Sequence, residues 1–457
     1  TLIILIGSTG LQVSSHKLIT DNVLLAGLSM AIYGLSLCGR RPVLGGFWLG
    51  TGAGVGFMAK GLLVPGILAL TVAVLIVGFQ SWRRTISLTV RLAAYGAVLP
   101  WVVIWPVALY QRSPALFKEW FFFQNLGRFF GVSLVGQKFE YFYYLMLLTW
   151  FALPSLPIAL WAVWRQKGEW KERKDLQLVL VLFTVILLVL SASSGKRDLY
   201  ALLLLPPLSL LAGGAAGSLP ERAALLMNRI ALVLFGTLAV VLWVGWAINL
   251  SGAPVFLASR LRHMQPDYTP VFSGPLFAVA CMYTILWIFA VTRSVRYGQT
   301  FLLNWTSGIV LVWGLAMTIW LPWFDAGSSL RPQFMSLREH IPEKCRAVMT
   351  LYLGESENAL LEYYTGVKPH AIIPEQSEQG MISGVTKGNN GKRKNSTDDA
   401  YQECDWLLIE NMREMTDAPD GLDWKPVFAV RRPIDPAARP KETFTLLTRN
   451  EGKRLCN

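Results

Sequence analysis

The residues of this sequence best suited to chemistry are charged or amide side chains in apolar surroundings. They are Asp21, Lys60, Asn125, Arg128, Lys196, Arg197 and Asp198. A charge close to membrane hydrocarbon is energetically costly and usually faces a polar cavity or a partner. Arg and Lys bind phosphate as guanidinium forks and point charges, and a low-dielectric wall strengthens both contacts. The residue types therefore favour a cavity that binds an anionic headgroup.

Snorkelling gives a second interpretation, in which Lys and Arg near helix ends reach the membrane interface and bind nothing. It suits Lys118, Arg128 and Lys138, because they lie in a loop rich in Phe, Trp and Tyr that is typical of an interfacial segment. It suits Lys60 less well, since the tight turn GVGFMAKGLLVPG leaves this side chain few directions. Asp21 also has an alternative role, as the N-cap of a helix.

The elements that must position these residues are membrane helices. Hydrophobic residues make up 53% of the 457 positions, and a bilayer core takes about 20 apolar residues per helix. Stretches of that kind occur at 19–38, 44–60, 63–80, 92–111, 141–164, 176–193, 199–217, 230–250, 272–292 and 301–323. A partial span over 1–13 precedes them. Thr1 lies inside this apolar run, so we expect the natural protein to continue upstream.

Lys and Arg are concentrated in alternate short loops, and such loops face the cytoplasm in membrane proteins. These loops contain Arg40, Arg41, Arg83, Arg84, Arg91, Arg165, Lys167, Lys171, Arg173, Lys174, Arg222, Arg229, Arg293 and Arg296. We expect the turn at Lys60, the loop 112–140, the turn 194–198 and the C-terminal region to face the exterior. The net charge of +13 reflects this bias. No RNA-binding motif or phosphate loop accompanies it, so no nucleic-acid partner is expected.

The apolar pattern stops near residue 323, which predicts a transmembrane domain over 1–323 with about 11 spans and a soluble α/β domain over 324–457. Strands are expected at RAVMTLYLG, DWLLIEN, PVFAVRR and FTLLTR, with helices near 332–340 and at GESENALLEYYTG. The polar stretch 374–400 is predicted to be a loop. Cys345 and Cys404 each precede a strand, and they form a disulfide candidate if those strands are neighbours.

Four motifs occur in a fixed order on the same predicted side of the membrane: TDN at 20–22, FMAKGLL at 57–63, NLGRFFG at 125–131 and SGKRDLYALLLLPPLSLLAG at 194–213. Together they resemble the C-type polyprenol-phosphate-dependent glycosyltransferases, and are similar to lipid A aminoarabinose transferases and protein O-mannosyltransferases. The resemblance implies a polytopic α-helical (GT-C-like) enzyme in the bacterial inner membrane. It implies transfer of a sugar from a polyprenyl-phosphate donor to a lipid A-like, protein or glycan acceptor at the outer face.

The resemblance also implies roles for individual residues. Donor phosphate or lipid-carrier binding falls to Lys60, Arg128, Lys196, Arg197 and Tyr200, and a supporting polar shell to Asp21, Asn125 and Asp198. The general base of such enzymes lies in the first exterior loop, so we expect it upstream of Thr1 and assign no catalytic residue.

One departure from the resemblance concerns a metal. Relatives often have a His before the paired aromatics that close the long loop, whereas this chain reads GQKFEYFYY with Lys138. The four His show no ligand spacing. No cofactor is evident, and a divalent metal is not supported by the residues present.

A polytopic secondary transporter with an exterior accessory domain is the main alternative, and a membrane scaffold presenting the C-terminal domain is another. Transporter sites lie near the bilayer midplane, often in broken helices. The charges of this chain instead cluster at helix ends on one side of the membrane, which favours chemistry at the interface on a lipid-borne substrate.

Overall fold

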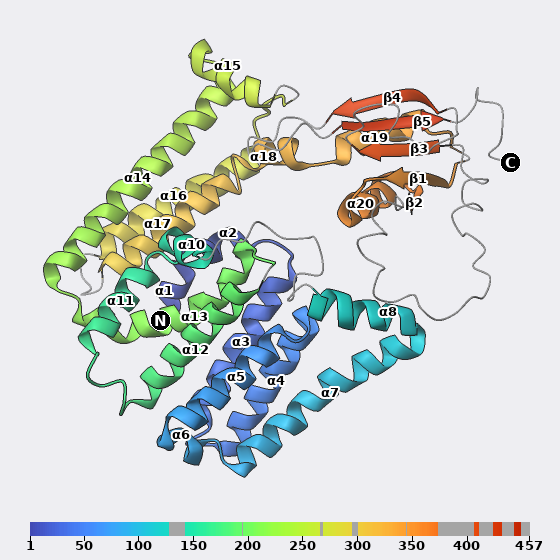
Figure 1. Cartoon of the computed structure of the whole chain (residues 1–457). Helices are drawn as coiled ribbons and strands as arrows, with labels where there is room; N and C mark the ends of the chain where they lie inside the picture. Colours follow the sequence, from blue (N-terminus) through green and yellow to red (C-terminus); the bar gives the residue numbers. More distant parts are fainter. Residues whose placement is uncertain are drawn as a thin grey trace. The chain divides into compact units, whose positions relative to one another are not determined.

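The protein forms two compact units, described by a computed structural model (Figure 1). The described residues are 1–127, 142–193, 195–265, 268–294, 300–343, 345–372, 406–410, 424–431 and 443–448. One unit comprises Thr1–Leu242 and Ala278–Ala316, and the other comprises Trp243–Phe277 and Met317–Asn457. The domain boundary expected at residue 323 stays a prediction.

The first unit is built from helices. They are α1 (Leu2–Ile6), α2 (Thr9–Ser15), α3 (Thr20–Leu37), α4 (Pro42–Lys60), α5 (Leu63–Gly78), α6 (Gln80–Thr85), α7 (Leu88–Arg112), α8 (Pro114–Lys118), the π-helix η1 (Glu119–Gly127), α10 (Tyr143–Phe151), α11 (Ser155–Arg165), α12 (Lys174–Ala192), the 3₁₀-helices η2 (Asp198–Leu204) and η3 (Ala216–Ser218), α13 (Leu205–Ala215), most of α14 (Glu221–Ser251), most of α16 (Gly274–Ser294) and α17 (Thr300–Ala316).

Six helices of the described chain are long and apolar enough to cross a membrane, by length and composition. They are α3, α7, α12, the continuous run of η2 with α13 and η3, α14 and α16. Two expected spans are bent: α10 and α11 meet at 106°, and α17 meets α18 (Leu321–Ser328) at 59°. Counting each bent pair as one span gives eight, and α5 is a shorter apolar helix. The prediction of a polytopic helical membrane protein is confirmed.

Glycines allow α3 and α4 to pack with their backbones close together. A Cβ added at Gly27 would lie 2.8 Å from the carbonyl oxygen of Gly52, and one at Gly34 would lie 2.4 Å from the backbone nitrogen of Leu49. Small residues permit such close approach between membrane helices. The two helices run in opposite directions, so the start of α3 lies beside the end of α4 (Figure 1).

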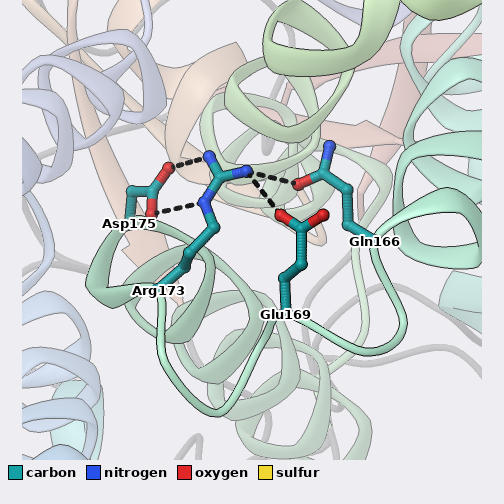
Figure 2. Close-up of polar contacts among 4 residues, drawn as sticks. All are labelled: Gln166, Glu169, Arg173 and Asp175. Carbon is teal, nitrogen blue, oxygen red and sulfur yellow. Dashed lines mark hydrogen bonds and ion pairs between the residues drawn. The ribbon is translucent and has the colours of Figure 1, made fainter.

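The loop between α11 and α12 is held by one arginine (Figure 2). Arg173 Nη2 donates to Asp175 Oδ2 at 2.5 Å, and Nη1 donates to Glu169 Oε2 at 3.1 Å and to Gln166 Oε1 at 3.3 Å. The hydrogen bonds to Asp175 and Glu169 raise the pKa of Arg173. All three charged side chains are substantially exposed, so this network orders the loop and adds little to global stability.

The second unit contains a five-stranded mixed sheet. Helices α15 (Val255–Met264), α18, α19 (Arg331–His340) and α20 (Glu355–Thr365) accompany strands β1 (Ala347–Leu351), β2 (Lys368–Ile372), β3 (Trp406–Glu410), β4 (Lys425–Arg431) and β5 (Thr443–Thr448). The strand order is β2-β1-β3-β5-β4. The β1 strand pairs in parallel with β2 and β3, whereas β5 pairs antiparallel with β3 and β4.

The core of this sheet domain is formed by α19, α20 and the strands, through residues such as Phe334, Leu361, Val348, Leu408 and Phe444. The strands and helices expected in this region are present. Sequence patterns did not predict β2, because Pro and His interrupt KPHAI; as an edge strand it tolerates a Pro. The expected loop 374–400 lies outside the described residues.

Candidate functional site

A cavity of about 510 Å³ lies within the first unit, where α3, α4, α5, α12, η1 and η2 end or begin. Its apolar wall comes mainly from helices α4, α5 and α12, and its polar groups come from the end of α4, from η1, and from η2 with the turn before it. The lining residues that matter below are Lys60, Gly61, Trp120, Asn125, Arg197 and Tyr200.

Asp21 and Lys60 form an ion pair at this cavity. Lys60 Nζ lies 2.6 Å from Asp21 Oδ1, and the two side chains are 21% and 5% exposed respectively. Asp21 occupies the first turn of α3 and Lys60 the last turn of α4, so each charge also interacts favourably with its own helix dipole. The N-cap role considered for Asp21 is wrong: Ile19 occupies that position and its side chain makes no capping bond.

Tyr200 provides a second contact for the same lysine. The Nζ atom of Lys60 lies 4.3 Å from the centre of the Tyr200 ring, within the range of a cation–π interaction. The ammonium therefore points to a carboxylate and an aromatic face beside the cavity. Snorkelling alone does not describe this side chain.

Asn125 connects the π-helix η1 to the turn after α4. Its Oδ1 accepts a hydrogen bond from the backbone nitrogen of Leu62 at 3.2 Å, and its Nδ2 donates to the carbonyl oxygen of Trp120 at 2.8 Å. Gly61 has φ +61°, and a Cβ there would lie 1.5 Å from Asn125 Oδ1. Only glycine fits both the backbone conformation and this contact.

Two tyrosines at the start of α10 hold the turn that supplies Arg197. The Tyr143 hydroxyl donates to Asp198 Oδ1. The Tyr144 hydroxyl lies 3.4 Å from both the backbone nitrogen and the carbonyl oxygen of Arg197, and Tyr144 itself is buried. Sequence reasoning missed both residues; the only signal was their position as paired aromatics opening a predicted span.

Of the eight expected site residues, four line this cavity and a fifth pairs with one of those four. Asn125, Arg197, Tyr200 and Lys60 line it, and Asp21 binds Lys60. Two more lie in the adjoining turn: Lys196 is buried at 2% exposure and is not among the lining residues, and Asp198 bonds Tyr143. Arg128 lies outside the described residues.

The described cavity has a polar end suited to an anion and an apolar wall beside it. Two cations, an amide and a tyrosine ring lie at its polar end, and Leu62, Ile67 and Val189 form part of its apolar wall. Across the described residues, no group of three His, Cys, Asp or Glu is placed to hold a metal ion. Such a cavity suits a phosphate headgroup attached to a hydrocarbon chain.

The disulfide candidate lies in the sheet domain. The pairing was expected only if the strands that follow the two cysteines are neighbours. They are: β1 and β3 pair in parallel, with Met349 opposite Leu407. Cys345 is buried, and Cys404 lies outside the described residues. The pairing itself stays a prediction.

Sequence comparison finds curated proteins similar to parts of this chain. No family model matches the chain. An undecaprenyl phosphate-alpha-4-amino-4-deoxy-L-arabinose arabinosyl transferase 1 of Pseudomonas fluorescens is 32% identical over 201 residues, which is 41% of this chain and 33% of the relative. A second transferase of that species is 25% identical over 388 residues, covering 82% of this chain and 60% of the relative. The matched regions thus span from a third to three fifths of these relatives.

A solved structure extends the likeness to almost the whole chain. The crystal structure of ArnT from Cupriavidus metallidurans bound to undecaprenyl phosphate aligns with a TM-score of 0.64 at 15% identity, covering 97% of this chain and 77% of that one. Its apo state aligns with a TM-score of 0.59.

Fold and sequence together define a class. The chain is a polytopic helical membrane protein with an ArnT-like fold and a C-terminal mixed β-sheet. It is a distant homologue, over much of its length, of the polyprenyl-phosphate-dependent C-type glycosyltransferases represented by the aminoarabinose transferases. The resemblance inferred from the four motifs is confirmed.

Proposed function

We propose that this protein is a membrane glycosyltransferase that takes its sugar from an undecaprenyl-phosphate-linked donor. The curated relatives are named for undecaprenyl-phosphate aminoarabinose transfer, and the structural relative was crystallised with undecaprenyl phosphate. The observation that carries the proposal is the cavity in which Lys60, Arg197 and Tyr200 meet beside an apolar wall. The acceptor is lipid A-like, a protein or a glycan.

The donor's phosphate would occupy the polar end of the cavity, with its polyprenyl chain along the apolar wall. During transfer the bond between the sugar's anomeric carbon and the phosphate oxygen breaks, the acceptor oxygen bonds to that carbon, and a hydroxyl acceptor gives its proton to a general base. Negative charge then grows on the departing polyprenyl phosphate. Preorganised cations such as Lys60 and Arg197 stabilise that charge more in the transition state than in the bound donor.

Other residues hold the two cationic side chains in position. Asp21 and the Tyr200 ring hold the Lys60 ammonium, and Tyr143 and Tyr144 hold the turn bearing Arg197. Lys196 and Arg128 are proposed as further phosphate contacts, and Asp198 and Asn125 as supporting polar groups. No described residue is assigned as the general base.

We place the reaction at the outer face of the bacterial inner membrane, with the sheet domain in the periplasm. The support is the alternation of Lys- and Arg-rich loops along the chain. A secondary transporter is less well supported, because Asp21 and Lys60 lie in the terminal turns of α3 and α4 instead of mid-helix breaks.

The proposal is tested with the natural full-length protein in liposomes that contain an undecaprenyl-phosphate sugar and a lipid A acceptor. We expect the sugar to appear on the acceptor, and to remain on the carrier in protein-free liposomes. Ion-coupled uptake of a solute with no sugar transfer to lipid, protein or glycan acceptors would contradict it.

A further inference from the structure

Helix α15 follows α14 and precedes α16 along the chain. Both α14 and α16 are long and apolar enough to span, and their adjoining ends contact each other: the Phe277 ring lies 5.7 Å from both Trp243 and Trp246. Clusters of Trp and Phe of this kind are typical of membrane interfaces. Helix α15 has 10 residues, half the length that a span requires.

Several apolar side chains of α15 are largely exposed. Val255 is 77% exposed, Phe256 67% and Met264 47%, whereas Ala258 is buried. Leaving such groups in water is unfavourable, by roughly 25 cal/mol for each Å² of apolar surface. The helix begins four residues after α14 ends, so if α14 spans the bilayer, the boundary between headgroups and acyl chains is the apolar medium within its reach.

The charges of α15 are all basic. The helix carries Arg260, Arg262 and His263 and has no acidic residue. The Arg260 guanidinium carbon lies 5.5 Å from the centre of the Phe256 ring. A cavity of about 400 Å³ is lined by Gly252, Val255, Ala258, Ser259, Arg262 and His263.

Gly252 gives the cavity its shape. It has φ +71°, and a Cβ there would lie 2.9 Å from Arg262 Nη2. Glycine at this position thus allows both the turn after α14 and the approach of the guanidinium to the backbone. Within the described residues, Arg262 makes no ion pair, so its charge remains available to an anion.

We infer that α15 is an interfacial helix that binds an anionic glycerophospholipid. Phe256, Val255 and Met264 enter the boundary between headgroups and acyl chains, and Arg262 with Ser259 and His263 contacts the lipid phosphate. The exposed apolar groups and the one-signed charge together favour a lipid surface over a protein partner. The site shares no residue with the cavity around Lys60, so the inference stands independently of the proposed function.

The test compares the full-length protein with Arg262→Gln and Arg331→Gln in detergent, titrated with phosphatidylglycerol or phosphatidylcholine. Native mass spectrometry counts the bound lipids. Arg331 is an exposed residue of the same unit, at the start of α19. Arg331→Gln is therefore the matched control, because it also removes one positive charge. We expect Arg262→Gln to weaken phosphatidylglycerol binding about five-fold, and Arg331→Gln to leave it unchanged.

Hydrogen exchange gives a second readout that locates the lipid. Amides of 255–264 should exchange more slowly in phosphatidylglycerol nanodiscs than in phosphatidylcholine nanodiscs, and Phe256→Ser should remove that difference. Equal binding of the two lipids, or equal loss in both Arg variants, would overturn the inference. Protection of 255–264 by inorganic phosphate alone, without lipid, would also overturn it.

Discussion

The Lys60 ammonium lies between the Asp21 carboxylate, at 2.6 Å, and the Tyr200 ring, at 4.3 Å from its centre. Three segments far apart in the sequence thus fix one positive charge at the edge of a cavity. The pair is largely buried, so each partner depends on the other: a charge left alone at such a site is strongly destabilising. This relationship underlies the proposed binding of a carrier phosphate.

Gly61→Ala should disrupt the docking of η1. The new Cβ would collide with Asn125 Oδ1, and φ +61° is strained for alanine, at about 1–3 kcal/mol. We expect a lower thermal unfolding midpoint and weaker donor binding. Gly78→Ala is the control, because a Cβ there meets nothing within 4 Å. Equal midpoints for the two variants would show that the Asn125 contact is not required.

Tyr143→Phe should loosen the turn that presents Arg197. The substitution removes only the hydroxyl that bonds Asp198, so the aromatic packing at the start of α10 remains. We expect turnover with a lipid-linked donor to fall several-fold while the unfolding midpoint changes little. Tyr95→Phe, at an exposed position on α7, controls for loss of a hydroxyl. Indistinguishable rates for the two variants would remove Tyr143 from the positioning role.

Cys345 and Cys404 should be paired in protein isolated from the membrane. Their strands are parallel neighbours, and an exterior compartment is oxidising. Peptide mapping without reductant should recover a peptide that joins the two residues and disappears on reduction. Cys38, which is buried in the first unit, should be recovered as a thiol. Recovery of Cys345 as a thiol in the same digest would refute the pairing.

The sheet domain should be accessible from outside the cell. A cysteine at Tyr363→Cys, where the native side chain is 79% exposed, should react with a membrane-impermeant maleimide in intact spheroplasts. Arg84→Cys, in the basic helix α6 between α5 and α7, should react only after permeabilisation. The reverse labelling pattern would invert the topology and move the proposed site to the cytoplasmic face.

Hydropathy predicted the class of fold because the length and apolar character of spanning helices follow from the bilayer itself. The orientation taken from loop charge stays a prediction. The bend between α10 and α11 was not foreseen, since an apolar run of adequate length reads as one straight span. The β2 strand was missed for a related reason: its edge position, which permits Pro369, depends on the pairing of other strands.

The sequence predicted which residues belong to the site better than it predicted which of them contact each other. Motif order pointed to Lys60, Asn125 and Tyr200, which the fold brings to one cavity. Asp21 was expected in the supporting polar shell or as a cap, but its pairing with Lys60 was not foreseen, because a contact across 39 positions of sequence depends on how α3 and α4 pack. Tyr143 acts through a hydrogen bond to Asp198, and no local pattern encodes such a contact.

The central claim is that the Lys60 charge binds the carrier phosphate, and donor affinity in a double-mutant cycle tests it most directly. In the full-length protein, Lys60→Met should weaken binding of undecaprenyl-phosphate sugar at least ten-fold, since a charge-assisted contact contributes about 1.5–3 kcal/mol. Asp21→Asn retains the ammonium and should weaken binding less. Adding Asp21→Asn to Lys60→Met should restore folding stability without restoring affinity. Donor affinity equal to wild type in Lys60→Met would contradict the account.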